Sequence, residues 1–448
     1  MARLFGTDGV RGVANSGLTP ELAMAIGRAA VATRKDYENK RMKILIGKDT
    51  RVSSDMLENA LAAGICSAGA DVLLLGFIPT PALAYLVREY GADAGVMITA
   101  SHNPMEFNGI KIINGDGYKL PDAAEDEIEE YINKGDTPEK RGTGRKVGSV
   151  SYSKSAVDDY VGHLYDLVGC DLSGLKVAMD CANGAACETA QKLFGRLGAD
   201  VVFTAVSPDG FNINDRVGST HLESIKDLTV KTGADIGIAF DGDADRCLAV
   251  DENGEEIDGD VIIGMFAKYL KKKGKLARDP TAVTIMSNLG LEVFCRNNGI
   301  TMVRTAVGDR YVLEEMLKEG YSLGGEQSGH VILSEYATTG DGQLTAVFLL
   351  RILKESGSKA SGLAGEIPRY PQIHASVGAD ADQKAAFDAD AGIKDYIKEL
   401  ELSLGGDYRM VVRVSGTEPI IRVMAEGKEL SKVEETVLGI SNKIRERI

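Results

Sequence analysis

The chain has 448 residues, of which 44% are hydrophobic and 26% are charged, and its formal net charge is −15. The length predicts roughly three domains, and the composition is that of a globular protein rather than a disordered chain. The excess of negative charge argues against nucleic acid or an anionic membrane as the main partner.

The six cysteines are scattered and form no CxxC pair, which is typical of a reducing compartment. The N-terminal segment contains no apolar signal region. The apolar stretch 72–87 contains Pro79 and Pro81 and is shorter than the roughly 20 residues that a spanning helix needs. The sequence therefore predicts a cytoplasmic protein.

An internal repeat is the most informative feature of the chain. Its three copies run over 43–76, 176–205 and 282–306. Each copy joins two apolar, β-branched runs through a Gly-containing turn and a helical stretch. This order is the βαβ pattern of a parallel sheet covered by helices.

A polar loop follows a further apolar run downstream of each copy. The segments 91–104 and 233–246 both open with Gly-Ala-Asp and become polar at the same point, and 320–330 resembles a third member. Because open α/β sheets bind ligands beyond the carboxyl ends of their strands, we expect the three loops to share one site. Three ordinary surface turns are the alternative.

The predicted fold is α/β, with three similar α/β/α domains containing mixed sheets and a smaller C-terminal α+β domain. The Gly- and charge-rich segment 134–151 predicts a linker, and a second junction falls near 251–260. After 366–371 the pattern changes to two strands around a tight turn, followed by an amphipathic helix. The expected domains are residues 1–150, 151–252, 253–368 and 369–448.

The acidic loop of the second copy has Asp241, Asp243 and Asp245 at alternate positions. Three carboxylates this close repel one another unless a cation neutralises them, and hard oxygen ligands suit Mg²⁺ or Ca²⁺. An EF-hand loop ending at Glu252 is disfavoured because Arg246 stands where Gly is required. An aspartyl-phosphate phosphatase and a solvated turn without metal stay open as alternatives.

The serine loop of the first copy places Ser101 at the corresponding strand end. Its spacing lacks the GxSxG elbow, which argues against an esterase triad, and a helix N-cap is the plain structural role. A serine facing a carboxylate-bound metal can instead carry a phosphoryl group. Lys111 and Lys119 add positive charge nearby.

Two further loops have the composition of a ligand site. Glu326 and Ser328 offer oxygen atoms to a hydroxyl-rich ligand, and the neighbouring His330 could transfer protons or be merely structural. In the segment 413–419, backbone N–H groups of a tight turn could form an anion nest beside Arg413, although Ser-Gly-Thr also makes a generic hairpin turn.

With these loops in view, the chain resembles the α-D-phosphohexomutase superfamily over essentially its full length. The family motifs appear in order as FGTDGVRG (5–12), TASHNP (99–104), DGDADR (241–246), GEQSGH (325–330) and RVSGTEP (413–419). Further segments resemble the phosphoglucosamine mutase branch: GYKLPD (117–122), PDGFNIN (208–214), GSTH (218–221), SNLGLE (287–292) and VGDRYV (307–312).

The resemblance implies an isomerase that moves a phosphoryl group between the 6- and 1-positions of glucosamine phosphate. It implies a phosphoserine at Ser101, a hexose or glucosamine 1,6-bisphosphate as intermediate and activator, and Mg²⁺ held by Ser101, Asp241, Asp243 and Asp245. The implied catalytic residues are Ser101, His102, Lys111, Arg246, His330 and Arg11. The implied substrate-binding residues are Glu326, Ser328, Gly308, Asp309, Arg310, Arg413, Ser415, Gly416, Thr417 and Arg422.

The expected partner is a small sugar phosphate, without nucleic acid or membrane, and the resemblance also admits a homodimer. Hinge motion of the last domain is expected, because a bisphosphate must turn without escaping. A phosphomannomutase/phosphoglucomutase of the same superfamily, a metal-dependent sugar phosphatase and a non-catalytic sensor are the competing hypotheses.

Overall fold

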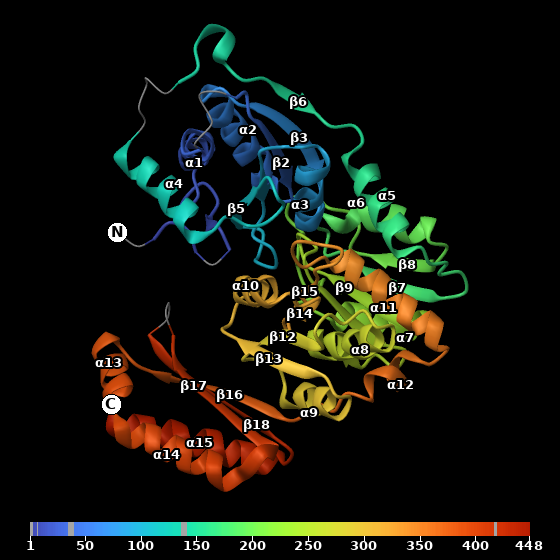
Figure 1. The fold of residues 1–448 in the computed structure, drawn as a ribbon, viewed down its shortest axis with the longest axis vertical. Helices are drawn as coiled ribbons and strands as arrows, with labels where there is room; N and C mark the ends of the chain where they lie inside the picture. The colour runs from blue at the N-terminus through green and yellow to red at the C-terminus, as the bar shows by residue number, and fades with distance from the viewer. Residues whose placement is uncertain (1–2, 7, 35–39, 136–140, 416–418) are drawn as a thin grey trace.

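The computed structural model describes residues 3–6, 8–34, 40–135, 141–415 and 419–448. Within these residues the chain folds into four successive units, each built on its own β-sheet (Figure 1). The first three are α/β units with mixed sheets and the fourth is a smaller α+β unit, so the predicted fold class is confirmed.

The first unit has a six-stranded sheet in the order β1-β5-β4-β2-β3-β6. Its elements are β1 (Val10–Val13), α1 (Pro20–Ala32), β2 (Lys43–Lys48), α2 (Val52–Ser67), β3 (Asp71–Phe77), α3 (Thr80–Glu89), β4 (Ala94–Ile98), β5 (Phe107–Asn114), α4 (Asp122–Lys134) and β6 (Val150–Tyr152). Helices α1 and α2 pack closely at two glycines, because a Cβ at Gly64 would lie 2.2 Å from the Met24 carbonyl oxygen and one at Gly27 2.6 Å from that of Leu61.

The second and third units repeat this plan with five and four strands. The second contains α5 (Ala156–Val168), β7 (Lys176–Asp180), α6 (Ala186–Arg196), β8 (Asp200–Thr204), α7 (Glu223–Thr232), β9 (Ile236–Phe240), β10 (Cys247–Asp251) and β11 (Glu256–Ile257). The third contains α8 (Gly259–Lys272), β12 (Pro280–Thr284), α9 (Leu289–Asn297), β13 (Thr301–Thr305), α10 (Asp309–Glu319), β14 (Leu323–Gly325), β15 (Val331–Leu333), α11 (Gly342–Ser356) and α12 (Ala360–Ala364).

The three sheets share one strand order, as the internal repeat predicts. The strand that opens each repeat, β2, β7 or β12, pairs in parallel with the strand after its helix on one side. On its other side it pairs in parallel with β4, β9 or β14, which in turn pairs with an antiparallel strand. The carboxyl ends of β4, β9 and β14 are therefore equivalent positions in three related sheets.

The first and second sheets extend a few residues beyond the domain limits expected from the sequence. β6 pairs with β3 and so adds residues 150–152 to the first sheet, and β11 adds residues 256–257 to the second. The expected limits at 150 and 252 consequently fall at or just before a terminal strand of each sheet.

The fourth unit contains more than the two strands and one helix expected from the sequence. Its sheet has the order β16-β18-β17, and it also has two helices between its first two strands. Its elements are β16 (Gln372–Gly378), α13 (Ala381–Ala389), α14 (Ala391–Leu404), β17 (Tyr408–Val414), β18 (Ile420–Gly427) and α15 (Leu430–Arg447).

The hydrophobic core joins the first three units and leaves the fourth separate. One buried cluster contains Leu83 of the first unit, Phe240 of the second and Phe348 of the third. The fourth unit has its own cluster, which includes Ile421, Val433 and Ile440. Three units thus form one packed body, whereas the fourth is attached at one side (Figure 1). No helix among the described residues is long and apolar enough to cross a membrane.

Candidate active site

Loops from the three equivalent strand ends meet at one place. Ser101 lies in the loop after β4, Asp241 directly follows β9, and Glu326 directly follows β14. The Ser101 hydroxyl donates a hydrogen bond of 2.6 Å to Asp241 Oδ2, although the two residues are 140 positions apart. The structure thus brings the serine loop of the first unit onto the acidic loop of the second.

The three aspartates of the acidic loop form a buried cluster. Asp241, Asp243 and Asp245 each offer a carboxylate oxygen, and these oxygens lie within 4.8 Å of one another. Burial and the two neighbouring carboxylates raise the pKa of Asp241 well above its ordinary value. Asp243 Oδ1 and Asp245 Oδ1 are buried and accept no hydrogen bond. Buried carboxylate oxygens without hydrogen-bond donors fit a divalent cation, so this loop has the ligand set of a metal site.

Two lysines connect the acidic loop to the third unit. Lys111 Nζ lies 2.9 Å from Asp243 Oδ2 and 3.0 Å from Asp8 Oδ2. Lys119 Nζ lies 2.6 Å from Asp8 Oδ1 and also 2.6 Å from Asp309 Oδ2. Burial alone would lower the pKa of Lys111, but the carboxylates around it outweigh burial and raise that pKa. Lys111 therefore stays charged and fixed beside the metal ligands.

His330 lies between two carboxylates at the junction of the second and third units. Its Nδ1 is 3.6 Å from Asp245 Oδ2, and its Nε2 is 3.6 Å from Asp309 Oδ2 and accepts a hydrogen bond of 3.0 Å from the Gly340 N–H. Burial opposes the charged imidazolium, but Asp245 and Asp309 outweigh it and raise the pKa of His330. The imidazole thus has a fixed orientation, with Nε2 accepting from the Gly340 N–H and Nδ1 facing Asp245.

Two arginines place positive charge beside the serine loop. Burial, followed by the Arg246 and Arg11 guanidinium groups, lowers the pKa of His102 to about 4. His102 Nδ1 is 3.4 Å from Ser101 Oγ. The Nε atoms of both arginines are buried without a hydrogen-bond acceptor. Donors of this kind are suited to an anionic ligand next to Ser101.

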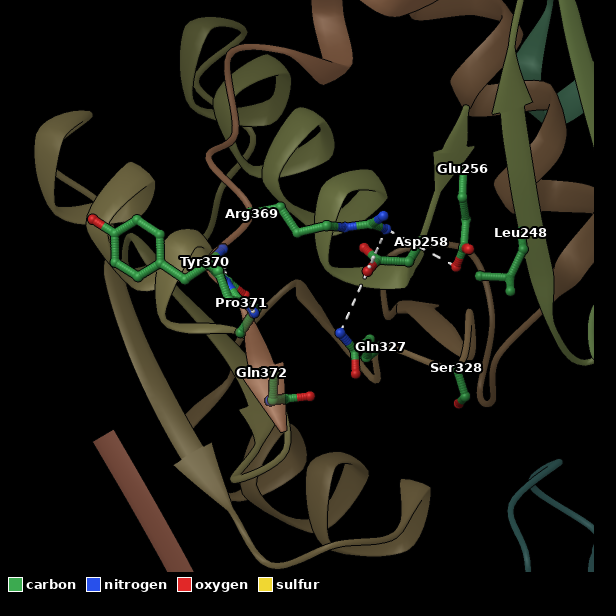
Figure 2. Close-up of a pocket in the computed structure, with 10 residues that line it drawn as sticks. Leu248, Glu256, Asp258, Gln327, Ser328, Arg369, Tyr370, Pro371 and Gln372 are labelled. Atoms are coloured by element: carbon green, nitrogen blue, oxygen red, sulfur yellow. Dashed lines mark hydrogen bonds and ion pairs between the residues drawn. The ribbon is translucent and has the colours of Figure 1, made fainter. Parts of the chain in front are cut away.

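The third loop faces an open pocket next to the linker that leads to the fourth unit (Figure 2). The pocket has a volume of about 680 Å³ and is lined by Leu248, Glu256, Asp258, Asn288, Gln327, Ser328, Arg369, Tyr370, Pro371 and Gln372. Arg369 and Asp258 point toward each other and form an ion pair of 2.8 Å. Ser328 Oγ is buried without a partner, and the Gly308 N–H favours the ionised form of Glu326, whose pKa burial raises.

The predicted phosphate loop lies at one end of the fourth sheet. Arg413 on β17 stands opposite Arg422 on β18. The Ser415 N–H donates to the Ile420 carbonyl over 2.9 Å, and its own carbonyl accepts from Lys384 Nζ over 2.7 Å. Gly416 and Thr417 lie outside the described residues.

Family models identify all four units. Models described as phosphoglucomutase/phosphomannomutase alpha/beta/alpha domains I, II and III match residues 2–139, 158–254 and 258–370, and the C-terminal domain model matches 378–442. The chain belongs to the phosphohexomutase family. It is 52% identical over 429 residues to the phosphoglucosamine mutase of Ruminiclostridium cellulolyticum, covering 96% of each chain. It is 50% identical over 447 residues to that of Clostridium beijerinckii, covering 100% of each chain.

Solved structures of phosphohexomutases share the fold. A phosphoglucomutase/phosphomannomutase family protein from Burkholderia thailandensis has a TM-score of 0.83 at 26% identity, with 99% of this chain and 98% of that chain covered. An N-acetylphosphoglucosamine mutase from Aspergillus fumigatus, in complex with GlcNAc-6P and magnesium, has a TM-score of 0.69 at 16% identity, with 99% and 96% covered.

Some polar residues at the centre of this phosphohexomutase were not singled out by sequence reasoning. Thr80, at the start of α3, donates through its hydroxyl to Asp243 Oδ2 over 2.6 Å, and its N–H donates to the Asp243 carbonyl over 3.0 Å. Asp8 joins Lys111 to Lys119. Asp8 lies within the motif FGTDGVRG, which was a signal for it, whereas nothing near Thr80 in the sequence marks it.

Arg310 is held by the first unit of the phosphohexomutase fold. Its Nη1 lies 2.5 Å from Asp122 Oδ1 on α4, and its Nε lies 3.0 Å from Glu314 Oε1. Glu125 lies beside this pair, 4.0 Å from Arg310 Nη1 and 3.6 Å from Arg3 Nη2. In this arrangement Arg310 connects α10 to α4 rather than contacting the serine loop.

Glu125 makes the stability of this contact depend on pH. Burial raises its pKa from the ordinary 4.5 to about 7, more than Arg310 and Arg3 lower it. The folded state therefore binds the proton more tightly than the unfolded state, and the free energy of unfolding decreases as the pH rises from 4.5 through about 7. Glu125→Gln should unfold at a higher temperature than the wild type near pH 8, with the difference vanishing near pH 4.5.

Thermal melts across this pH range check the prediction. Glu130→Gln is the control, because that exposed carboxylate on the same helix pairs only with the nearby Lys134 among the ion pairs described. Melting temperatures of Glu125→Gln and the wild type that change in parallel with pH would contradict it.

Proposed function

We propose that this phosphohexomutase interconverts glucosamine 6-phosphate and glucosamine 1-phosphate through a phosphoserine enzyme and a 1,6-bisphosphate intermediate. The observation that carries the proposal is the hydrogen bond of 2.6 Å between the Ser101 hydroxyl and Asp241 of the buried acidic cluster. Relatives named phosphoglucosamine mutase, about half identical over the whole chain, support the amino-sugar substrate. The product would enter the synthesis of an amino-sugar nucleotide.

Ser101 is proposed to carry the phosphoryl group. Asp241, Asp243, Asp245 and an oxygen of that phosphoryl group would hold Mg²⁺, which neutralises charge on the phosphoryl oxygens when it is bound. Arg11 and Arg246, whose Nε atoms lack acceptors, would bind the remaining oxygens. His102 stays neutral near pH 7 because its pKa is about 4, so it adds no further charge beside the nucleophile.

Proton transfer is assigned to Lys111 and His330. The sugar hydroxyl that attacks must lose a proton, and Ser101 Oγ must be protonated when it leaves, so the site needs one group on each side of the reaction. Lys111 is charged and lies beside Asp243, whereas His330 is oriented by Asp245, Asp309 and the Gly340 N–H. Positioned groups of this kind contribute about 10²- to 10⁴-fold to rate.

The sugar is proposed to lie between the third and fourth units. Ser328, which lines the open pocket, and the neighbouring Glu326 would bind its hydroxyl groups. By the family resemblance, Gly308, Asp309 and Arg310 would also contact the sugar. The non-reacting phosphate would be bound by Arg413, Ser415, Gly416, Thr417 and Arg422. These assignments follow the family resemblance, with the unpartnered Ser328 Oγ as their structural support.

The bisphosphate must turn around between the two transfers, and the fourth unit is proposed to open and close over it. Its separate hydrophobic core supports this motion. Arg409 docks the unit onto the third one, with donor distances of 2.7 Å to the Ile285 carbonyl and 2.9 Å to that of Ser287. Such a limited polar contact suits a pivot. A cytoplasmic location stays a prediction from the sequence, and a homodimer stays one from the family resemblance.

The substrate is tested by comparing kcat/KM for the 6-phosphates of glucosamine, glucose and mannose, with Mg²⁺ and a hexose 1,6-bisphosphate present. We expect the glucosamine substrate to be preferred by at least about tenfold, since a few polar contacts decide sugar recognition. Preference for glucose or mannose phosphate would assign the enzyme to the phosphoglucomutase/phosphomannomutase activity instead. Release of inorganic phosphate as the main product would indicate a phosphatase.

A further inference from the structure

The segment PDGFNIN (208–214) crosses from the second unit to the first, and the proposed reaction assigns it no role. It lies between β8 and α7, outside both. The Val52 N–H, at the start of α2, donates to the Gly210 carbonyl over 2.9 Å. Asn214 is 7% exposed, and its side-chain amide donates to the carbonyl oxygens of Ser101 over 2.9 Å and Asn103 over 3.1 Å. The segment therefore ends on the backbone of the serine loop.

A buried arginine of the first unit binds the same carbonyl oxygens. Arg51 is 1% exposed, and its Nη2 donates to the Ser101 carbonyl over 2.9 Å and to the Asn103 carbonyl over 2.8 Å. Its Nη1 donates to the Pro104 carbonyl over 2.5 Å, and its Nε pairs with Asp49 Oδ2 over 2.9 Å. Three carbonyl oxygens of the serine loop thus accept hydrogen bonds from one guanidinium group, and Asn214 of the second unit donates to two of the same three oxygens.

The conformation held by these donors is a costly one. Ser101 has a φ of 52°, the left-handed region that a serine rarely adopts and that costs of the order of 1 kcal/mol. Its carbonyl also lies tightly against the acidic loop, because a Cβ at Gly242 would come within 2.6 Å of it. In this left-handed conformation the Ser101 hydroxyl donates to Asp241, whereas the Ser101 carbonyl oxygen accepts hydrogen bonds from Asn214 and Arg51.

We propose that Asn214 is a positioning residue for phosphoryl transfer: together with Arg51 it holds the Ser101 backbone so that the nucleophile of the first unit stays aligned with the metal ligands of the second. The inference rests on the proposed function, since it requires Ser101 to carry the phosphoryl group. Nucleophile and metal ligands come from different units, and Asn214 ties the acidic unit directly to the backbone of the nucleophile.

The test is Asn214→Asp in the full-length enzyme. Asp is nearly isosteric, tolerates the left-handed backbone of Asn214 (φ 57°), and lacks the amide donors. We expect kcat to fall about 10- to 100-fold with KM for glucosamine 6-phosphate within about twofold, because small misplacements of reacting groups reduce rate rather than binding. Phosphorylation of Ser101 by a hexose 1,6-bisphosphate, followed by intact mass, should slow by the same factor.

Asn212→Asp is the matched control. Asn212 belongs to the same segment, but its amide donates to the Ser207 carbonyl over 3.0 Å, away from the serine loop. Its kcat should equal that of the wild type. Asn214→Gly serves as a second variant without an added charge. Glycine accepts the left-handed backbone (φ 57°) and lacks the amide donors, so it should show the same loss of kcat and keeps the test valid if the Asp variant does not fold.

Each outcome decides the proposal. Wild-type kcat in both Asn214 variants, an effect on KM alone, or an equal loss of kcat in Asn212→Asp would overturn the positioning role. These results differ from failure of the proposed function, in which the wild type itself would form no glucosamine 1-phosphate.

Discussion

Replacing Ser101 with alanine should abolish mutase turnover, by on the order of 10⁴-fold or more, because the variant lacks the hydroxyl of the proposed nucleophile. Ser101 is 1% exposed, and its hydroxyl is bonded only to Asp241 and His102 among the described contacts. The backbone donors on its carbonyl do not depend on the side chain, so the fold should persist. Formation of glucosamine 1-phosphate from glucosamine 6-phosphate is the measurement.

The control for this variant is Ser151→Ala. Ser151 lies on the edge strand β6, where its hydroxyl donates to the Val72 carbonyl over 3.2 Å, far along the chain from the catalytic loops. Peptide mapping after incubation with a hexose 1,6-bisphosphate should find phosphate on Ser101 in the control and none in Ser101→Ala. Undiminished turnover in Ser101→Ala would refute the phosphoserine mechanism. Acid-labile phosphate on Asp241 would favour the phosphatase hypothesis.

The sequence predicts the first three units well because their strands are buried parallel strands. The runs 43–51 and 176–184 open with apolar residues that become β2 and β7, and both strands are buried along almost their whole length because helices cover the sheet. The repeat then predicts the strand order, because its three copies have the same sequence of strands and helices and pack in the same way. The acidic loop also leads straight into strand β10, which excludes the EF-hand alternative.

The fourth unit is predicted less completely for a physical reason. Strand β16 is half exposed, and its alternation of polar and apolar residues is too short to stand out. Helix α13 has little apolar character, and the capping box between Asp380 and Gln383 at its start is a purely local signal. Secondary structure that depends on caps and edge pairing leaves a weaker pattern than secondary structure that is fully buried.

The residues of the site also differ in how well the sequence predicts them. Residues in strand-end loops, such as Ser101 and Asp241, are predicted because the topology brings equivalent loops together. The contacts between units are not predicted: the sequence singles out Lys119 and Asp309 separately, but they are 190 positions apart, and Asn214 and Ser101 are 113 apart. No local pattern relates such residues, because only the packing of whole units makes them neighbours.

The net charge of −15 does not describe the charge inside the site. Lys111 and Lys119 are held among carboxylates at the centre of the site, and Arg11 and Arg246 flank the serine loop. An acidic protein can thus bind an anionic sugar phosphate, because a low-dielectric site responds to the cations that line it more than to the distant surface.

The Asp241→Asn variant should be more stable than the wild type without a metal and less stable than the wild type with Mg²⁺. Without a cation, burial and the other two aspartates raise the pKa of Asp241, so desolvation and repulsion at this carboxyl destabilise the folded wild type at pH values above the unfolded-state pKa. Asp241→Asn removes that repulsion and should unfold at a higher temperature than the wild type in EDTA. The difference should shrink as the pH falls toward the unfolded-state pKa of the carboxyl, because protonation removes the same repulsion.

With Mg²⁺ the order should invert. The wild type gains about 2.7 kcal/mol when free Mg²⁺ is a hundred times its dissociation constant, whereas the variant has lost one ligand and gains less. Turnover should fall about 10²- to 10³-fold in the variant, the scale of losing one electrostatic stabiliser of a transition state. Asp215→Asn is the control, since Asp215 is exposed and outside the cluster. Melting curves of Asp241→Asn and the wild type that shift equally on adding Mg²⁺ would show that Asp241 does not bind the metal, because loss of a charged ligand must weaken the stabilisation by Mg²⁺.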